Sequence, residues 1–371
     1  MRILAFVKYG TLSASTRQRF MQYEPYLRAA GMEVEYAPLL GNSYLQALVD
    51  GRQPSRFRTV TAYVARLRKL LACKEYDLLW VHSEFFPYLP GWAEWLTFGL
   101  RKKPVVIDFD DAIFHNYDAH PRTFVRRTLG GKLKPLLSRA AGCCCGNPYI
   151  QNYVSRYCAN SIVVPTVVDA ARYVPRASGV ARREKPVIGW IGSPSTWRYM
   201  LPVLPLLKEL ADSGLASVRV VGAGAQAAAD GFAGLEFIDW NEETEIGEVQ
   251  AMDIGIMPVP DEKWARGKSG YKLIQFMACG LPVVASPVGV NTEIVLQGVN
   301  GFLAEELSDW RAALIRLCKD PELRAAMGSV GRRRVEEEYS VQAQASRVVE
   351  LLASSALGAK VHGRGLHPGV L

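Results

Sequence analysis

The sequence lacks the features that mark several large classes of protein. Its seven cysteines are an odd number, and none has the spacing of a metal-ligand or redox pair. Three are consecutive, at 143–145, and adjacent cysteines do not easily bridge one another, so we expect the small, buried, reduced side chains of a cytoplasmic protein. No cleavable leader is visible, and no apolar stretch reaches about 18 uncharged residues. The nearest, 85–100, contains Glu94 and two prolines, so we do not expect a membrane span.

Acidic residues are scarce in the first half of the chain. Residues 1–170 hold 22 Lys and Arg against 13 Asp and Glu, whereas residues 171–371 hold 22 against 23. No nucleic-acid-binding motif accompanies this positive charge. It therefore favours an anionic substrate or peripheral contact with an anionic membrane, and no nucleic acid as partner.

Residues 51–74 contain seven basic residues and no acidic one. Apolar residues recur there at helical spacing: Phe57, Val60, Val64, Leu67 and Leu71. This pattern predicts a basic amphipathic helix. Such a helix could lie on anionic lipid or on a partner, or it could cover a sheet and leave its basic face in solvent. The aromatic residues that follow, among them Trp92 and Trp95, favour core packing or a membrane surface.

The length of 371 residues suits two domains of about 150–200 residues each. Buried strands are predicted at 3–7, 77–82, 104–108, 187–191, 217–221, 235–238, 254–257 and 282–285, with helices between them. This alternation indicates α/β domains with parallel sheets, although the G-x-G-x-x-G fingerprint of dinucleotide-binding domains is absent. We predict a first domain at 1–172, a linker at 173–186, a second domain at 187–338, a helix at 339–355 and a disordered tail at 356–371.

A basic, glycine-spaced loop, 266–272 (RGKSGYK), precedes a predicted helix that ends at Cys279-Gly280. Unpaired N–H groups at a helix start attract anions, and Lys268 and Lys272 would add full charges there. We infer a site for a pyrophosphate. The alternative is a plain connection with solvated lysines.

Two other strand ends carry polar residues. Gly192 and Ser193 follow strand 187–191 and form a second turn suited to phosphate, with Arg198 nearby. Asp110 and Asp111 follow strand 104–108 with His115 close behind, and could meet a sugar or an acceptor hydroxyl, or simply cap a helix. An Asp-x-Asp element can also hold a divalent metal, but we expect no metal site because the phosphate signals lie in the second half.

The run MACGLPVVASPVGVNTEIVLQGVNGFL at 277–303 resembles the C-terminal signature of family 4 glycosyltransferases. These are retaining enzymes of the two-domain GT-B architecture. In register with that family, Gln275 and Gly267 stand where a Glu-x7-Glu motif usually has its two glutamates. The K-S-G-Y-K-x-x-Q run found instead resembles a branch with lysines in this loop. The resemblance is specific mainly over 264–303, and weaker at 187–198 and 162–169.

The resemblance implies a GT-B fold, with two doubly wound Rossmann-like domains facing across a cleft and a final helix crossing back to the first domain. It implies transfer of a sugar, with retention, from a nucleotide-diphosphate sugar to a glycan, lipid-linked or small-molecule acceptor. A UDP-sugar is favoured, and no metal or other cofactor is expected. The alternatives are an epimerase of the same fold and a nucleotide-sugar-binding protein without activity.

Candidate site residues follow from the loops and the resemblance together. The catalytic candidates are Lys268, Lys272, Asp110 and Asp111. The donor-binding candidates are Gly192, Ser193, Arg198, Ser269, Gly270, Tyr271, Gln275 and Glu293. The acceptor-binding candidates are Ser15, Arg17, Arg19 and His115, for which helix capping and surface charge are the alternatives. Trp240 could stack on a base or be a packed surface aromatic.

Overall fold

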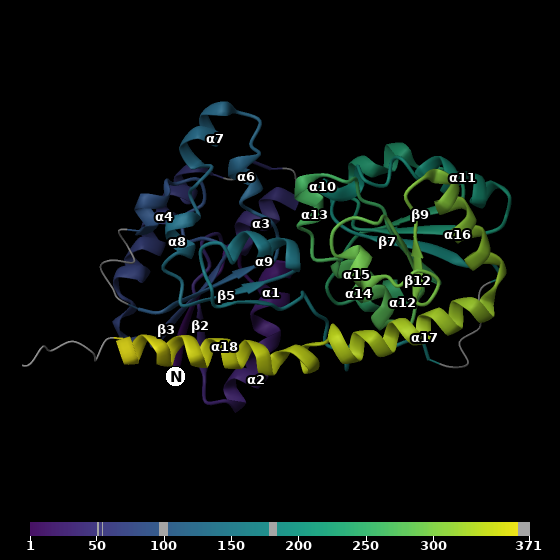
Figure 1. Ribbon diagram of the computed structural model, residues 1–371. Coiled ribbons are helices and arrows are strands. Elements are labelled where there is room, and N and C mark those ends of the chain that lie inside the picture. Colours follow the sequence, from purple (N-terminus) through teal and green to yellow (C-terminus); the bar gives the residue numbers. More distant parts are fainter. Residues whose placement is uncertain (50–51, 54, 96–102, 178–183, 363–371) are drawn as a thin grey trace, which may run out of the picture. The chain divides into compact units, whose positions relative to one another are not determined.

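The computed structural model describes residues 1–49, 52–53, 55–95, 103–177 and 184–362. The chain divides into two compact units (Figure 1). Unit 1 comprises Met1–Thr166 together with the chain from Gln344 onward, and unit 2 comprises Val167–Ala343. The middle of the predicted linker, 178–183, and the predicted tail from 363 onward lie outside the described residues.

Unit 1 is built on a parallel sheet of six strands in the order β2-β1-β3-β4-β5-β6. The strands are β1 (Arg2–Phe6), β2 (Glu33–Tyr36), β3 (Leu78–His82), β4 (Val105–Phe109), β5 (Gly142–Cys145) and β6 (Ser161–Val163). β3, β4 and β5 are buried along their whole length, which explains why they read as continuous apolar runs. Cys143, Cys144 and Cys145 are free thiols within β5, so the predicted small buried side chains are confirmed.

Helices of unit 1 connect these strands. They are α1 (Ala14–Arg19), α2 (Glu24–Ala29), α3 (Asn42–Val49), α4 (Arg56–Leu71), α6 (His115–Asp118), α7 (Thr123–Leu129), α8 (Lys134–Leu137) and α9 (Pro148–Val154), with short 3-10 turns at Met21–Tyr23 and Cys73–Glu75. The last helix, α18 (Val341–His362), also belongs mostly to this unit. Gly142 has no room for a side chain, because Ser355 and Leu351 of α18 would lie 2.8 and 2.9 Å from its Cβ.

The helical course of α18 corrects one sequence prediction. The helix was expected over 339–355 and a disordered tail from 356, but α18 continues to His362. Val348, Leu351, Leu352 and Ala356 are buried, and this apolar face holds the helix on unit 1. Among the described residues, no helix combines the length and the apolar character that crossing a bilayer requires.

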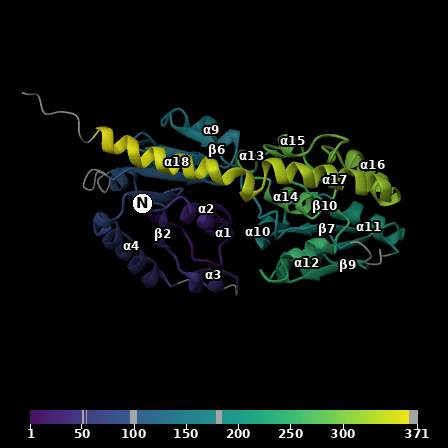
Figure 2. The ribbon, with the colours of Figure 1, turned by 90° about the horizontal axis from the view of Figure 1, so that it is seen from below.

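Unit 2 is built on a second parallel sheet, in the order β12-β11-β10-β7-β8-β9. Figure 2 shows β7, β9 and β10 of this sheet from below. Its strands are β7 (Val187–Ile191), β8 (Ser217–Val221), β9 (Leu235–Ile238), β10 (Ile254–Met257), β11 (Val283–Ala285) and β12 (Gly301–Leu303). Because β8 and β9 lie on one side of β7 and β10, β11 and β12 on the other, the sheet is doubly wound, with its switch point between β7 and β10.

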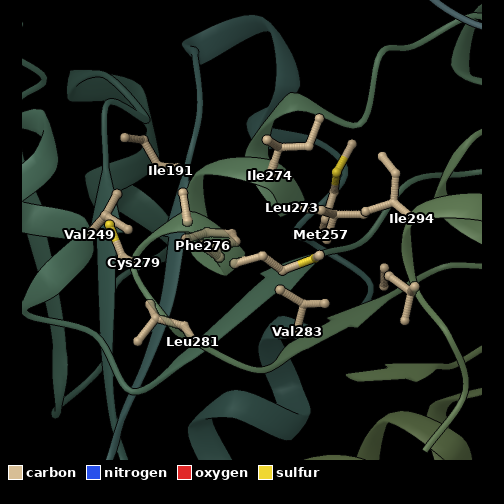
Figure 3. Packing of buried hydrophobic residues seen from close by; sticks show 14 of the residues in the cluster. Ile191, Val249, Met257, Leu273, Ile274, Phe276, Cys279, Leu281, Val283 and Ile294 are labelled. Atoms are coloured by element: carbon tan, nitrogen blue, oxygen red, sulfur yellow. The ribbon is translucent and has the colours of Figure 1, made fainter. Parts of the chain in front are cut away.

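Eight helices are described in unit 2 among residues 167–177 and 184–343. They are α10 (Pro194–Trp197), α11 (Leu204–Asp212), α12 (Glu245–Gln250), α13 (Lys263–Arg266), α14 (Tyr271–Ala278), α15 (Asn291–Ile294), α16 (Leu307–Lys319) and α17 (Pro321–Glu338), with a 3-10 turn at Ala225–Asp230. α14 lies at the centre of one of the two hydrophobic clusters of this unit, and residues 273, 274 and 276–278 are fully buried (Figure 3). The helix that begins at the basic loop is therefore fixed by the core beneath it.

Candidate functional site

The switch point of the unit 2 sheet brings two of the predicted loops to neighbouring strand ends. In open α/β sheets, ligands bind outside the carboxyl ends of the strands where the strand order reverses. β7 pairs directly with β10. The loop after β7 contains Gly192 and Ser193, and the segment after β10 leads through α13 to the basic loop. The geometry thus places both predicted anion-binding turns where this class of sheet binds its ligands.

The indole of Trp190 lies between these two turns. A side chain at position 192 would collide with the Trp190 ring, so only glycine fits there. On the other side, Nζ of Lys272 lies 5.6 Å from the centroid of the same ring. Gly192 and Lys272 are 80 positions apart in sequence but share one neighbour. Trp190 thus brings the glycine turn after β7 and the Lys272 ammonium group into one part of unit 2.

Gly270 sets the direction in which α14 begins. Its φ of +66° lies in the left-handed region, and an added Cβ would collide with Ile294. Only glycine satisfies both conditions without strain. Lys268 and Ser269, which precede it, are half-buried, and so are Tyr271 and Lys272 in the first turn of the helix. The sequence prediction that glycines shape this loop is confirmed at position 270.

The turn at Gly192-Ser193 is less open to a ligand than the sequence indicated. The N–H group of Ser193 donates to Oγ1 of Thr196 at 3.2 Å, so a side chain of α10 already uses it. Arg198, at the end of α10, is exposed, and its guanidinium lies 5.0 Å from the Tyr199 ring. A phosphate at this turn would compete with Thr196 for the backbone donor.

Gln275 is buried and faces two residues that sequence reasoning did not connect with it. Its Nε2 donates to Oε1 of Glu245 at 2.8 Å and to the hydroxyl of Tyr173 at 3.0 Å. Tyr173 also donates to Glu245. Burial raises the pKa of Tyr173, and the Glu245 carboxylate acts in the same direction, so this hydroxyl keeps its proton at neutral pH. Gln275 itself is only 3% exposed, and its amide nitrogen donates to two acceptors.

Glu245 also holds the aromatic residue proposed for base stacking. Nε1 of Trp240 donates to Oε2 of Glu245 at 2.5 Å, and the Trp240 side chain remains partly exposed. A carboxylate therefore stands beside the position where the family usually has a glutamate, but it comes from α12. Glu293, the second candidate for a ribose contact, is exposed on α15.

A cavity of about 420 Å³ opens on the same edge of unit 2. It is lined by Arg198, Tyr199, Pro202, Val203, Pro258, Val259, Pro260, Glu262, Ser286, Glu305, Leu307 and Trp310. Of the predicted donor-binding residues, only Arg198 lines it. The cavity holds two carboxylates and one guanidinium, whereas the region around Trp190 combines a lysine with glycine turns. We regard the Trp190 region as the better anion site, because it combines a lysine with a glycine turn.

Unit 1 has a polar cluster at the carboxyl ends of β1, β3 and β4. His82, the last residue of β3, lies with Nε2 3.0 Å from Oδ1 of Asp110. Burial alone would raise the pKa of Asp110, but the His82 imidazole and a hydrogen bond from Ser15 hold it well below its usual value. Asp110 is thus an ionised acceptor at neutral pH. The structure brings together two predicted residues, Ser15 and Asp110, and adds His82, which sequence reasoning missed.

Backbone strain accompanies this cluster. Ser83 follows His82 and has a φ of +64°, which is uncommon for a residue with a side chain. Its Oγ and the Nδ1 of His82 are buried and have no hydrogen-bond partner among the described residues. Such strain and unsatisfied polar atoms cluster at functional sites. The signal available in the sequence was a histidine ending a buried strand.

Arg19 is not placed to touch an acceptor, which corrects its assignment. It is 1% exposed, and its guanidinium makes two hydrogen bonds with Asp108 at 2.7 and 3.2 Å. A third bond, at 2.7 Å, goes to the carbonyl of Val164. Asp108 ends up inside the domain because it alternates with apolar neighbours on a buried strand, and Arg19 neutralises it there.

The remaining candidates of unit 1 are held by local contacts. Nδ1 of His115 lies 2.7 Å from Oδ1 of Asp118, and its Nε2 lies 2.8 Å from the Tyr149 hydroxyl. Both ring nitrogens are therefore in use. Arg17 donates to the carbonyl of Thr11 at 3.0 Å. Asp111 is half-buried in the turn before α6.

Part of unit 2 is similar in sequence to a family of known proteins. Residues 185–320 match the sequence model of the family described as "Glycosyl transferases group 1". The chain is 34% identical over 115 residues to the GDP-mannose-dependent monoacylated alpha-(1-6)-phosphatidylinositol monomannoside mannosyltransferase of Corynebacterium glutamicum, a match covering 29% of each chain. The chain spans less than half the length of the curated relatives it matches.

Solved structures extend the likeness to the whole chain. Sucrose-phosphate synthase of Thermosynechococcus elongatus has a TM-score of 0.70 at 16% identity, covering 98% of this chain and all of its own. Alr3699/HepE of Anabaena, in complex with UDP and glucose, has a TM-score of 0.71 at 17% identity, covering 95% of this chain and all of its own. The predicted GT-B fold class is thereby confirmed. The stretch that matches the model described as "Glycosyl transferases group 1" lies within unit 2.

Proposed function

We propose that the protein transfers a sugar from a nucleotide-diphosphate sugar to a hydroxyl of a glycan, a lipid-linked acceptor or a small molecule, with retention at the anomeric carbon and without a metal. The observation that carries the proposal is the convergence of Gly192, Lys272 and the Gly270-led start of α14 around Trp190. It lies inside the stretch that matches the glycosyl transferase family. The proposed location is the cytoplasm, with contact at the inner face of the membrane.

The proposed reaction exchanges one bond at the sugar for another. The bond between the anomeric carbon and the diphosphate oxygen breaks, and a bond to the acceptor oxygen forms on the same face. The acceptor proton passes to the departing diphosphate. Lys268, Lys272 and Arg198 would stabilise the negative charge that develops on the diphosphate, and such preorganised charge is a large term in catalysis.

Residues of the polar cluster in unit 1 would serve the acceptor or the sugar. The low pKa of Asp110 keeps its carboxylate ionised, so it can accept a hydrogen bond from a substrate hydroxyl. His82 and Ser15 would position it, because both contact its side chain. Gln275 and Glu245 are proposed to order the donor site from below, and Glu293 and Tyr271 remain proposed donor contacts.

The relatives support a nucleotide sugar in general and differ on the nucleoside. The mannosyltransferase of Corynebacterium glutamicum is named for GDP-mannose and for a phosphatidylinositol mannoside. The Anabaena protein was solved with UDP and, in another structure, with UDP-glucose. We favour a UDP-sugar as donor. The name of the Corynebacterium glutamicum enzyme supports a lipid-linked acceptor as one of the candidates.

Ligand binding tests the donor site first. Thermal unfolding is measured with UDP, GDP, ADP and inorganic pyrophosphate, each at a range of concentrations. A ligand at 100 times its dissociation constant stabilises the fold by about 2.7 kcal/mol. We expect one nucleoside diphosphate to stabilise the protein most. If none of them shifts the transition, the proposed donor site is wrong.

Lysine variants then test catalysis. Loss of one preorganised donor typically costs about 3 kcal/mol, or roughly two orders of magnitude in rate. We expect Lys268→Ala and Lys272→Ala each to lower turnover at least about tenfold and to weaken diphosphate binding, with the fold intact. Lys319→Ala, at the exposed end of α16, is the matched control. Wild-type turnover in both lysine variants would refute their role, and product formation from the sugar nucleotide without an acceptor would indicate an epimerase.

A further inference from the structure

Most large apolar residues of α4 face solvent rather than the sheet of unit 1. Phe57 is 77% exposed and Val60 62%, and the same stripe continues along the helix with exposed Val64, Leu67 and Leu71. A surface helix normally buries such a stripe against the core. The interpretation that this helix covers the sheet with its apolar residues is therefore wrong. A contiguous exposed apolar stripe of this kind marks an interaction site.

A different face of α4 holds the helix in place. Arg66 is buried and donates to the carbonyls of Val7, Ala37 and Phe85, and Leu70 is buried beside it. At about 100° per residue, the five stripe residues lie about 100–180° around the helix axis from Arg66. The stripe residues therefore do not hold α4 on the core of unit 1. Both ribbon views show α4 at the outside of unit 1 (Figures 1 and 2).

The next segment of the chain adds exposed aromatic residues beside this stripe. Trp92 is 64% exposed, Tyr88 59% and Trp95 44%. The segment is attached to α4 through the Tyr63 hydroxyl, which donates to the carbonyl of Pro87 at 2.9 Å. Tyr63 lies on the side of the helix between Arg66 and the stripe. This hydrogen bond holds the start of the aromatic segment next to α4.

Buried charges anchor the aromatic segment from beneath. Glu94 is fully buried and lies 3.2 Å from Nζ of Lys132, and it accepts from the N–H group of Phe86 at 3.3 Å. The N–H group of Tyr88 donates to the Tyr117 hydroxyl at 3.1 Å while Tyr88 itself holds a φ of +60°. A non-glycine residue keeps such a conformation only where its surroundings enforce it. The outward display of these rings is thus built into the fold.

The charge around the stripe selects the partner. Residues 51–74 carry seven basic side chains and no acidic one, Arg56 and Arg68 border the stripe, and Arg139 lies 4.6 Å from the Trp95 ring. A second copy of the chain would bring the same positive charge against itself, which disfavours a symmetric dimer through this face. Trp and Tyr at an interface, an apolar stripe and flanking Arg are the features that bind anionic bilayers.

We propose that the exposed stripe of α4, together with Tyr88, Trp92 and Trp95, docks unit 1 onto a bilayer that contains anionic lipid. The stripe enters the boundary between headgroups and acyl chains, and the arginines meet the lipid phosphates. This deepens the proposed function, because a lipid-linked acceptor would be met at such a surface. The docking itself does not depend on the transfer reaction.

Co-sedimentation with vesicles tests the surface in the absence of donor and acceptor. The full chain is mixed with vesicles of phosphatidylcholine alone or with added phosphatidylglycerol, at low and high salt. We expect binding to the anionic vesicles at least tenfold tighter than to phosphatidylcholine, and weaker binding at high salt. The double variant Val64→Gln/Leu67→Gln should lose at least tenfold in partitioning. The double variant Arg56→Gln/Arg68→Gln should bind more weakly and with less dependence on salt.

A matched control separates this surface from exposed apolar residues in general. Leu296 and Val299 in unit 2 are 42% and 48% exposed, and Leu296→Gln/Val299→Gln should bind vesicles as the wild type does. Stabilisation by a nucleoside diphosphate should be unchanged in Val64→Gln/Leu67→Gln, called the α4 variant below. A failure of the donor site and a failure of docking are therefore distinguishable.

Two outcomes would overturn the proposal. One is anionic-vesicle binding that the α4 variant leaves unchanged, or no vesicle binding at all. The other is self-association of the wild type in sedimentation velocity that the α4 variant abolishes, because the stripe would then belong to an interface between copies.

Discussion

At the scale of single residues, the functional candidates are shaped by partners far away in the sequence. Gln275 meets Glu245 across 30 positions, and Asp110 meets His82 across 28. No periodicity or motif reports such pairs, because each partner sits on a different strand or helix and only the sheet order brings them together. The sequence offered Asp110, Ser15 and the lysine loop as candidates from their places at strand and helix ends, but not His82 or Glu245.

Arg19 illustrates the opposite error. A basic residue just after a glycine loop suggested a substrate contact, and the structure instead pairs it with Asp108 inside unit 1. In the sequence the two charges lie on separate elements. The sequence alone does not show whether a strand residue points into the core or toward the site. Burial of both partners leaves neither available to a substrate.

Glu94 predicts a pH dependence of stability. Burial raises its pKa to about 7, with the Lys132 ammonium opposing the shift, whereas an unfolded glutamate titrates near about 4.3. Between these values the folded state binds more protons, so the free energy of unfolding falls as pH rises and then levels off above about 7. Glu94→Gln should remove this decline, which for one group is at most about 1.4 kcal/mol per pH unit.

Urea unfolding at pH 5, 6, 7 and 8 measures that decline. Glu305→Gln, which changes an exposed carboxyl in unit 2, should leave the profile of the wild type unchanged. Parallel profiles for Glu94→Gln and the wild type would show that the carboxyl does not titrate in this range.

At the scale of elements, the strands and the helix after the basic loop followed from the sequence with small errors. The strands at 187–191, 217–221, 235–238 and 254–257 have the predicted bounds, because each is a short run between turn residues. All but 235–238 are largely buried. α4 was predicted as a helix from its spacing, yet the same spacing could not say which face would be buried. Three carbonyl groups that Arg66 satisfies decide this, and they come from distant segments.

Gly270 provides a prediction for the start of α14. Gly270→Ala would force a side chain into the left-handed region and against Ile294. Strain of this kind costs about 1–3 kcal/mol, so we expect that loss of stability together with weaker diphosphate binding. Gly298→Ala is the control, because Gly298 has a φ of +75° but nothing within 4 Å of an added Cβ.

Chemical unfolding and diphosphate titration of both glycine variants provide the readout. Gly298→Ala should pay only the backbone cost and bind the ligand normally. If Gly270→Ala binds the diphosphate as the wild type does, the helix start does not orient the ligand.

At the scale of the whole molecule, the two units were foreseen from length and from the βα alternation, but the extent of the last helix was not. α18 follows α17 after a short break and then supplies core residues to unit 1. Small and polar residues are frequent in its second half, so its apolar pattern is weak. Packing on β5, visible at Gly142, explains why the helix continues.

We predict that a core substitution in α18, at Leu352, destabilises only unit 1. Leu352 is fully buried, and Leu→Ala in a core typically costs about 2–5 kcal/mol. We expect Leu352→Ala to speed amide hydrogen exchange in the strands of unit 1 and to leave β7–β12 unchanged. Leu357→Ala, on the same helix but 62% exposed, is the control. Equal acceleration in both units would contradict the division of the chain.

The division also bears on how the protein is made. Unit 2 is one unbroken run, Val167–Ala343, while unit 1 is assembled from two runs that bracket it. On the ribosome, all of unit 2 leaves the exit tunnel before α18 does. Unit 2 can therefore complete its fold first. Until the final helix emerges, Gly142 and its neighbours in unit 1 stay uncovered.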